Sequence, residues 1–171
     1  MYQILKQIAK IGIISQPPPD TDESLRIVQQ RLSEAVLQRF GRSLAIRHVD
    51  AGSCNGCELE IHAANGAHYN LDRLGIKFVA SPRHADLLLV TGPVSKNMEE
   101  ALRRTYDATP EPKLVVALGD CGCTGGIFGE SYASCGRVSN VVPVDVGVPG
   151  CPPPPLAILQ GILTAISPPA R

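Results

Sequence analysis

Leu114–Gly126 reads LVVALGDCGCTGG and joins an unbroken apolar run to a glycine-rich loop with two cysteines. The apolar run predicts a strand over Lys113–Leu118 that is buried on both faces, as strands of parallel sheets are. A second continuous run predicts a buried strand over Ala85–Val90. Strands of this kind need helices on both faces of their sheet, so the fold class is expected to be α/β.

Predicted strands and helices alternate along the rest of the chain from residue 42 onward. Three further strands are expected over Leu44–Val49, Ile76–Ala80 and Val141–Val146. Three helices are expected over Glu58–Ala67, Asn97–Tyr106 and Leu156–Ile166. This alternation predicts one open parallel sheet, doubly wound by helices on both faces, over residues 42–171.

Residues 1–41 are interpreted as an N-terminal helical extension of that domain. A short amphipathic helix is indicated by apolar residues that fall at helical spacing with lysines between them: Met1, Ile4, Leu5, Ile8 and Ile11. Such a helix could lie on a partner protein, lie at a membrane surface or pack on its own domain. A second amphipathic helix is predicted over Asp22–Phe40, and its position ahead of the core predicts an appendage.

Composition narrows the class of protein. The chain has 171 residues, enough for one domain with a proper core. Its formal net charge is zero and its aromatic content is 4%, which argues against a nucleic-acid partner. Lysines interrupt the first apolar stretch, so no secretory signal is expected, and no apolar run approaches the roughly 20 residues that cross a bilayer. In the cytoplasm that this predicts, cysteine clusters bind metal more often than they form disulfides.

Cysteines follow three of the predicted strands. Cys54 and Cys57, in AGSCNGCELE, follow the first strand, whereas Cys121 and Cys151 follow two later ones. Because ligands of parallel sheets bind beyond the carboxyl ends of the strands, these four thiols are expected to converge at one edge. Seven flanking glycines leave backbone N–H groups free to approach a bound group: Gly52, Gly56, Gly119, Gly122, Gly125, Gly126 and Gly150.

Three kinds of site use such cysteines. Four thiolates bind zinc at tetrahedral geometry, but structural zinc ligands usually come as two close pairs, whereas Cys121 and Cys151 lie singly on distant loops. Cys121-Gly-Cys123 still leaves a second pair conceivable. The spread of the ligands favours a 4Fe-4S cluster. A redox disulfide would leave the other cysteine loops unexplained.

Three ordered motifs, CNGCELE at 54–60, GDCGCTGG at 119–126 and PGCPP at 149–153, resemble the cluster-bearing small subunit shared by nickel-iron hydrogenases and respiratory complex I. This is the family of the complex I 20 kDa, B or PSST-type subunit, and the resemblance runs from about Val49 to about Ile166. It implies a flavodoxin-like domain that holds one 4Fe-4S cluster through Cys54, Cys57, Cys121 and Cys151. Within this resemblance Cys123 is not a ligand. Cys135 has no counterpart in the family and is expected to be a buried apolar thiol.

Departures from the family pattern point to one branch. Complex I small subunits carry adjacent cysteines where this sequence has Cys54-Asn-Gly-Cys57, and conventional uptake hydrogenases add a cysteine-rich domain after the position of Arg171. The chain therefore looks most like the small subunit of membrane-bound hydrogenases of the formate hydrogenlyase or hydrogenase-4 type.

The resemblance also implies a function and its partners. The subunit would relay electrons between a ferredoxin-like 4Fe-4S subunit and a large catalytic subunit, with integral membrane subunits holding it at the cytoplasmic side of the membrane. A complex I-like subunit that serves a quinone site is the alternative within the family. A structural zinc-binding scaffold is the alternative from another class.

Two carboxylates lie beside the first cysteine pair. Glu58 and Glu60 would be placed to couple proton movement to cluster reduction. An equally good interpretation is that they are acidic residues stabilised by the dipole at a helix N-terminus. Ordinary structural or surface roles are expected for the histidines: His48, His62, His68 and His84.

Overall fold

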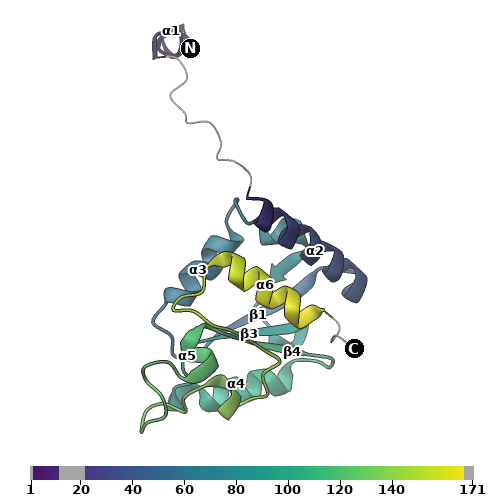
Figure 1. Cartoon of the computed structure of the whole chain (residues 1–171), viewed down its shortest axis with the longest axis vertical. Coiled ribbons are helices and arrows are strands. Elements are labelled where there is room, and N and C mark those ends of the chain that lie inside the picture. Colours follow the sequence, from purple (N-terminus) through teal and green to yellow (C-terminus); the bar gives the residue numbers. More distant parts are fainter. Residues whose placement is uncertain (1, 12–21, 168–171) are drawn as a thin grey trace.

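The computed structural model describes residues 2–11 and 22–167, so Met1 of the predicted first helix lies outside the described part. Five strands form one parallel sheet in the order β2-β1-β3-β4-β5 (Figure 1). The strands are β1 (Leu44–Asp50), β2 (Ile76–Phe78), β3 (Leu87–Thr91), β4 (Leu114–Leu118) and β5 (Val146–Val148). This order is that of flavodoxin-like folds, which confirms the predicted parallel, doubly wound sheet.

Helices cover both faces of the sheet (Figure 1). One face packs against α2 (Glu23–Phe40), α3 (Gly56–Asn65) and α6 (Pro155–Ile166). The other face packs against α4 (Lys96–Ala108), α5 (Gly119–Thr124) and the short helix η3 (Val138–Asn140). The remaining helical segments are α1 (Tyr2–Ile11), η1 (Leu71–Leu74) and η2 (Pro82–His84). None of the described helices is both long enough and apolar enough to span a membrane.

The buried strands alternate between two hydrophobic cores, as the two-residue period of a strand requires. In β3, Leu87 and Leu89 contribute to the core beneath α2, α3 and α6, whereas Leu88 and Val90 contribute to the core on the α4 side. All four side chains are fully buried. The apolar run that predicted β3 therefore reflects a strand with a packed helix layer on each face.

Strand register brings the carboxyl ends of four strands into one row. Asp50 at the end of β1 pairs with Thr91 at the end of β3, and Thr91 pairs with Leu118 at the end of β4. Leu118 in turn pairs with Val148, the last residue of β5. The loops that carry the cysteines therefore leave the sheet at the same level.

α2 differs from the expected appendage. Asp22 caps it, because its Oδ1 accepts hydrogen bonds from the backbone N–H groups of Ser24 and Leu25, and Gly41 ends it in the left-handed conformation. The apolar side of the helix, with Leu25, Leu32 and Val36 buried, forms part of the core shared with α6. The apolar stripe of α2 is thus packed on the domain beside α6 and η1, and the predicted domain boundary at residue 41 stays a prediction.

The last strand also differs from its prediction. Val141 and Val142 were expected to begin it, but they follow η3 and pack in the core on the α4 side. The ladder with β4 begins only at Val146. A run of valines does not distinguish a strand from a buried connecting segment. Where the strand begins is determined by its backbone hydrogen bonds to β4.

Candidate functional site

The first cysteine loop is fixed by the end of β1. Asp50 Oδ1 accepts hydrogen bonds from the backbone N–H groups of Gly52 and Ser53, each at 2.8 Å, which folds the chain sharply after the strand. Cys54 follows and is exposed, whereas Cys57 lies in the first turn of α3 and is half-buried. A rigid turn thus presents both thiols beyond the carboxyl end of β1.

The two other cysteine loops are tied to each other. The backbone N–H of Asp120 donates to the carbonyl of Gly150 at 2.8 Å, and the N–H of Gly150 donates to Asp120 Oδ1 at 2.8 Å. Asp120 directly precedes Cys121, and Gly150 directly precedes Cys151. These two hydrogen bonds therefore fix the loop of the half-buried Cys121 relative to the loop of the exposed Cys151.

Glycines lie directly against two of the sulfur atoms. A Cβ atom at Gly119 would stand 2.7 Å from Cys57 Sγ, and one at Gly126 would stand 2.8 Å from Cys121 Sγ. Both glycines have positive φ angles, +81° and +55°, which L-residues with a side chain rarely adopt. The backbone approaches the thiols more closely than any other residue type would allow.

The four thiols influence one another electrostatically. Burial raises the pKa of the Cys57 thiol to about 12, and the negative charge of Glu58 and of the other three cysteines adds to this shift. The pKa of Cys121 is also raised, chiefly by burial and then by Cys151 and Cys54. The structure thus places Cys54, Cys57, Cys121 and Cys151 on three loops that leave one edge of the sheet, where their charges act on one another. Thiolates in such a group repel one another unless a cation lies among them.

The donor set is suited to an iron-sulfur cluster. Soft thiolate ligands, close backbone approach and partial burial are the features by which proteins hold such clusters. Within residues 2–11 and 22–167, no three side chains of His, Cys, Asp or Glu lie close enough together to bind one metal ion. The four thiols lie on loops at one edge of the sheet with glycine backbone against two of them, and their binding of a cluster stays a prediction.

Cys123 lies apart from this group. Its Sγ donates to the carbonyl of Ala117 at 3.5 Å and packs near Gly147, where a Cβ atom would stand 3.1 Å from the sulfur. Burial raises the pKa of its thiol. Cys123 therefore points into the packing between α5 and the strands β4 and β5.

Cys135 is buried as expected, but its surroundings are not wholly apolar. Its Sγ donates to Glu99 Oε2 at 3.2 Å, and Lys96 Nζ lies 3.7 Å from the same oxygen. Burial raises the pKa of the thiol and the carboxylate of Glu99 adds to the shift. Cys135 therefore lies in the core on the α4 side, as expected for a buried thiol, and α4 also places the carboxylate of Glu99 within hydrogen-bond distance of its sulfur.

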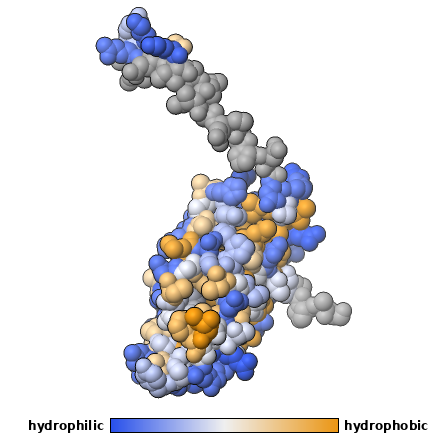
Figure 2. Space-filling view, turned by 60° about the vertical axis from the view of Figure 1, so that its left-hand side comes forward, coloured by the Kyte–Doolittle hydropathy of each residue, from blue (hydrophilic) through white to orange (hydrophobic). Residues whose placement is uncertain are grey.

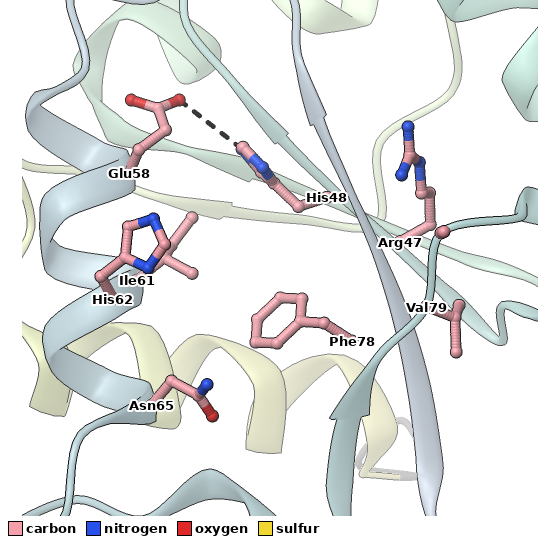
Figure 3. A pocket seen from close by; sticks show the side chains of 9 residues that line it. Arg47, His48, Glu58, Ile61, His62, Asn65, Phe78 and Val79 are labelled. Carbon is pink, nitrogen blue, oxygen red and sulfur yellow. Dashed lines mark ion pairs between the residues drawn. The ribbon is translucent and has the colours of Figure 1, made fainter.

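Glu58 makes the polar contacts that sequence reasoning missed (Figure 3). Its Oε1 accepts from the hydroxyl of Thr91. Oε1 also lies 3.5 Å from His48 Nε2, the pair joined by the dashed line in Figure 3. His48 Nε2 in turn lies 2.9 Å from Thr91 Oγ1. Burial lowers the pKa of His48, against the opposing effect of Glu58. His48 thus belongs to a polar network with Glu58 and Thr91. One feature of the sequence could have indicated Thr91: it is the only polar residue of the strand LLLVT, at its carboxyl end.

A cavity of about 400 Å³ opens beside this network, between α3, β1 and the end of β2 (Figure 3). Glu58 is 8% exposed, and its second oxygen, Oε2, has no hydrogen-bond partner among the described residues. Arg47 Nε is likewise buried without a partner in that part of the chain. Glu60, the other predicted carboxylate, is half-exposed and does not line this cavity.

Large apolar side chains are exposed close to the cysteine loops. Leu59, next to Glu58 in α3, is 61% exposed. Ile127, Phe128 and Tyr132, in the loop that follows Cys121, are 93%, 57% and 99% exposed. On the face that Figure 2 draws, hydrophobic residues lie among hydrophilic ones at the surface. Where exposed apolar side chains form one contiguous patch, the patch is typical of a surface that contacts another protein.

Comparison with known proteins gives consistent results. The profile of the family described as "NADH ubiquinone oxidoreductase, 20 Kd subunit" matches residues 54–165. A probable membrane-bound hydrogenase subunit of Pyrococcus furiosus is 47% identical over 81% of this chain and 84% of its own length. Formate hydrogenlyase subunit 7 of Escherichia coli is 43% identical over 87% of this chain, which spans 57% of that protein. An NADH-quinone oxidoreductase subunit of Desulfovibrio desulfuricans is 50% identical over 74% of this chain and 68% of its own length.

Two solved structures share the architecture. A chain of the membrane-bound sulfane sulfur reductase, described as an archaeal respiratory membrane complex, superposes with a TM-score of 0.65 at 34% identity, covering 79% of this chain and 73% of that one. A chain of an NAD+-reducing NiFe-hydrogenase superposes with a TM-score of 0.58 at 20% identity, covering 76% of this chain and 96% of the other. The second likeness concerns the fold alone.

Proposed function

Because the chain belongs to the family described as NADH ubiquinone oxidoreductase, 20 Kd subunit, we propose that it is the electron-transfer small subunit of a membrane-associated nickel-iron hydrogenase and holds one 4Fe-4S cluster. The relatives named above are subunits of oxidoreductase complexes. Two of them belong to a membrane-bound hydrogenase and a formate hydrogenlyase, which supports the hydrogenase branch.

One observation carries the proposal. Three loops that leave the aligned ends of β1, β4 and β5 carry the four cysteines at one edge of the sheet, and glycine backbone lies against two of the sulfurs. The proposed ligands are Cys54, Cys57, Cys121 and Cys151. A 4Fe-4S cluster, when bound, supplies one-electron transfer at a potential set by its ligands, hydrogen bonds and burial.

The residues around the thiols would have different roles in holding a 4Fe-4S cluster. Asp50 and Asp120 fix the loops by accepting backbone hydrogen bonds, while Gly119 and Gly126 permit close approach. Cys54 and Cys151 are exposed. Together with the exposed apolar residues near them, they mark the side of the site that a large catalytic subunit would cover.

The remaining partners stay part of the proposal. A ferredoxin-like 4Fe-4S subunit would exchange electrons with this chain, and integral membrane subunits would hold it at the cytoplasmic side of the membrane. The named relatives of a membrane-bound hydrogenase and of a respiratory membrane complex support such an assembly. Roles of Glu58 and Glu60 in proton coupling also stay a prediction.

Anaerobic purification of the full chain tests the cluster. We expect a brown protein with iron and labile sulfide near four each per chain, as the 4Fe-4S type requires, and an electron paramagnetic resonance signal on reduction. Cys54→Ser and Cys121→Ser are expected to lose most of the iron. Cys123→Ser and Cys135→Ser are the matched controls and are expected to keep it, since their thiols lie apart from the group.

Two outcomes would overturn the proposed cofactor. A colourless protein with one zinc and no iron would support the structural scaffold instead. Iron loss on Cys123→Ser equal to that on Cys121→Ser would show that the ligand set is wrong.

A second function is favoured by one specific comparison. The NADH-quinone oxidoreductase relative is 50% identical over 128 residues, so a quinone-reducing complex is the alternative. The large subunit that copurifies with the tagged chain separates the two. Nickel in the copurified complex, together with hydrogen-dependent dye reduction, supports the hydrogenase. A nickel-free complex that reduces a quinone supports the alternative.

A further inference from the structure

A cysteine outside the proposed ligand set is held close to a lysine by pairing of the chain before α4 with the chain before η3. Ser95 and Ser134 form an antiparallel β-bridge. On one side of this bridge, the N–H of Cys135 donates to the carbonyl of Val94 at 2.7 Å. On the other side, the N–H of Lys96 donates at 2.9 Å to the residue before Ser134. Cys135 and Lys96 are therefore diagonal neighbours across the pairing, a separation that a long side chain can reach across.

Glu99 lies beside both the thiol and the amine. Its Oε2 accepts from Cys135 Sγ at 3.2 Å and lies 3.7 Å from Lys96 Nζ. Its Oε1 accepts from Arg103 at 3.1 Å, which holds the carboxylate in place. A hydrogen bond with the Cys135 side chain is the largest of the effects that raise the pKa of Lys96. The sulfur and the nitrogen therefore contact each other as well as the same carboxylate oxygen.

A cavity of about 360 Å³ opens beside these three groups. Cys135, Lys96 and Glu99 line it together with loop residues that include Glu130 and Ser134. The side chain of Lys96 is 52% exposed, whereas Cys135 is 8% exposed. A molecule as small as a peroxide can therefore approach the thiol, while little of the residue is open to larger molecules.

We propose that Cys135 and Lys96 form a covalent sulfur–nitrogen bond when hydrogen peroxide reaches this cavity. In the first step the sulfur attacks one peroxide oxygen, so that an S–O bond forms and the O–O bond breaks. The thiol proton leaves with the departing hydroxide as water, and a sulfenic acid remains. The sulfur loses the two electrons that the peroxide gains.

The second step joins the two side chains. Lys96 gives its ammonium proton to solvent, and its nitrogen then attacks the sulfur of the sulfenic acid. The S–N bond forms, the S–O bond breaks, and hydroxide leaves as water with a proton from the nitrogen. A sulfenic acid without a partner is oxidised further and irreversibly, whereas a neighbouring nucleophile traps it. The proximity of Lys96 favours trapping, since groups held in contact react as if at very high concentration.

The bond uses none of the cysteines proposed as cluster ligands, so the inference goes beyond the proposed function and does not depend on it. It would add a covalent tie between the start of α4 and the chain before η3, where one short backbone pairing now joins them. Cys135 would thereby be spared irreversible oxidation, because a thiol reductant can reopen the bond.

Peptide mass analysis of the full chain after peroxide treatment tests the inference. Treatment is carried out at about pH 9, where a small part of the lysine is unprotonated, and remaining thiols are then alkylated. We expect a tryptic product in which the peptides of Lys96 and Cys135 are joined with the loss of two hydrogen atoms. Trypsin should no longer cut after Lys96, should still cut after the exposed Lys77, and should cut after Lys96 again once dithiothreitol is added.

Matched variants identify the two reacting groups. Lys96→Arg keeps the positive charge, but a guanidinium does not lose its proton in proteins, so it forms no such bond. In Lys96→Arg and Cys135→Ser the yield of joined peptide should fall at least roughly tenfold. Cys123→Ser removes the other thiol outside the proposed ligand set, which donates to the carbonyl of Ala117, and should keep the full yield.

Three results would overturn the inference. They are unchanged cutting after Lys96 on peroxide treatment, an equal yield of joined Cys135 peptide in Lys96→Arg, and a joined product that keeps one oxygen atom between sulfur and nitrogen. Iron content does not enter any of these readouts, so failure here is distinct from failure of the proposed function.

Discussion

Asp120 and Gly150 hydrogen-bond each other twice, backbone to backbone and backbone to carboxylate, each bond at 2.8 Å. An identical arrangement joins Asp145 to Val115 at the other end of the sheet, with bonds of 2.7 and 2.9 Å. The same local chemistry therefore supports the cysteine loops in one place and only the start of β4 in the other.

Replacing Asp120 with Ala is expected to lower the free energy of unfolding by about 1–2 kcal/mol, because the N–H of Gly150 loses its partner. It should also lower the iron content, since the loops of Cys121 and Cys151 are no longer tied. Asp145→Ala is the matched control and should cost similar stability while the iron content is kept. Equal iron losses in the two variants would show that stability, and not loop geometry, controls loading.

Gly119→Ala tests the close approach to Cys57. The positive φ angle costs a residue with a Cβ atom about 1–2 kcal/mol, and the new methyl group would stand 2.7 Å from Cys57 Sγ. Gly129→Ala has a similar φ of +53° with no atom within 4 Å of the added Cβ. Both variants should lose comparable stability in urea unfolding, but only Gly119→Ala should lose iron. Full iron content in Gly119→Ala would contradict this account.

Thr91→Val removes the hydroxyl that donates to Glu58 while keeping the shape of the side chain. Glu58 is buried and already has one oxygen without a partner among the described residues, so the variant should lose about 1–3 kcal/mol of unfolding free energy. Thr91→Ser keeps the hydroxyl and should retain most of the stability. Denaturant unfolding of both proteins at neutral pH checks the difference, and equal stabilities would mean that the hydroxyl contributes nothing.

Leu32→Ala tests whether α2 belongs to the core. Leu32 is fully buried, so truncation should cost about 2–5 kcal/mol. Leu37, on the same helix, is 68% exposed, and Leu37→Ala should change the stability by less than about 0.5 kcal/mol. Thermal unfolding of the two variants measures the contrast. A mild effect of Leu32→Ala would favour the interpretation of α2 as an appendage.

The sequence was most informative where one physical cause dominates. Continuous apolar runs arise when both faces of a strand are buried, so β3 and β4 were predicted correctly, and parallel pairing then implied that the cysteine loops share one edge. Amphipathic spacing predicted α2 as a helix. It did not reveal what covers the apolar side, because periodicity records that a side is buried and not by which element.

Other features depend on partners that are distant in sequence. Thr91 contacts Glu58, which lies 33 positions away in the sequence. The residues around either one give no indication of this partner. Cys135 meets Glu99 across 36 positions in the same way. Val141 and Val142 have the composition of a strand, but the ladder begins later, at Val146. In each case the structure depends on a contact between residues far apart in the sequence, which local composition does not reveal.

The last residues of four strands are paired side by side in the sheet: Asp50, Thr91, Leu118 and Val148. This alignment has a consequence for protein engineering. Because the strands stop together, the cysteine loops all leave the sheet at one level, and the loops of Cys121 and Cys151, which are hydrogen-bonded to each other, would be exchanged as a pair. A change of length between Cys54 and Cys57 would move Cys54 relative to the other thiols and leave the buried Ala51 in place. Designers seeking a different geometry of thiols can therefore begin from this scaffold and vary one connection at a time.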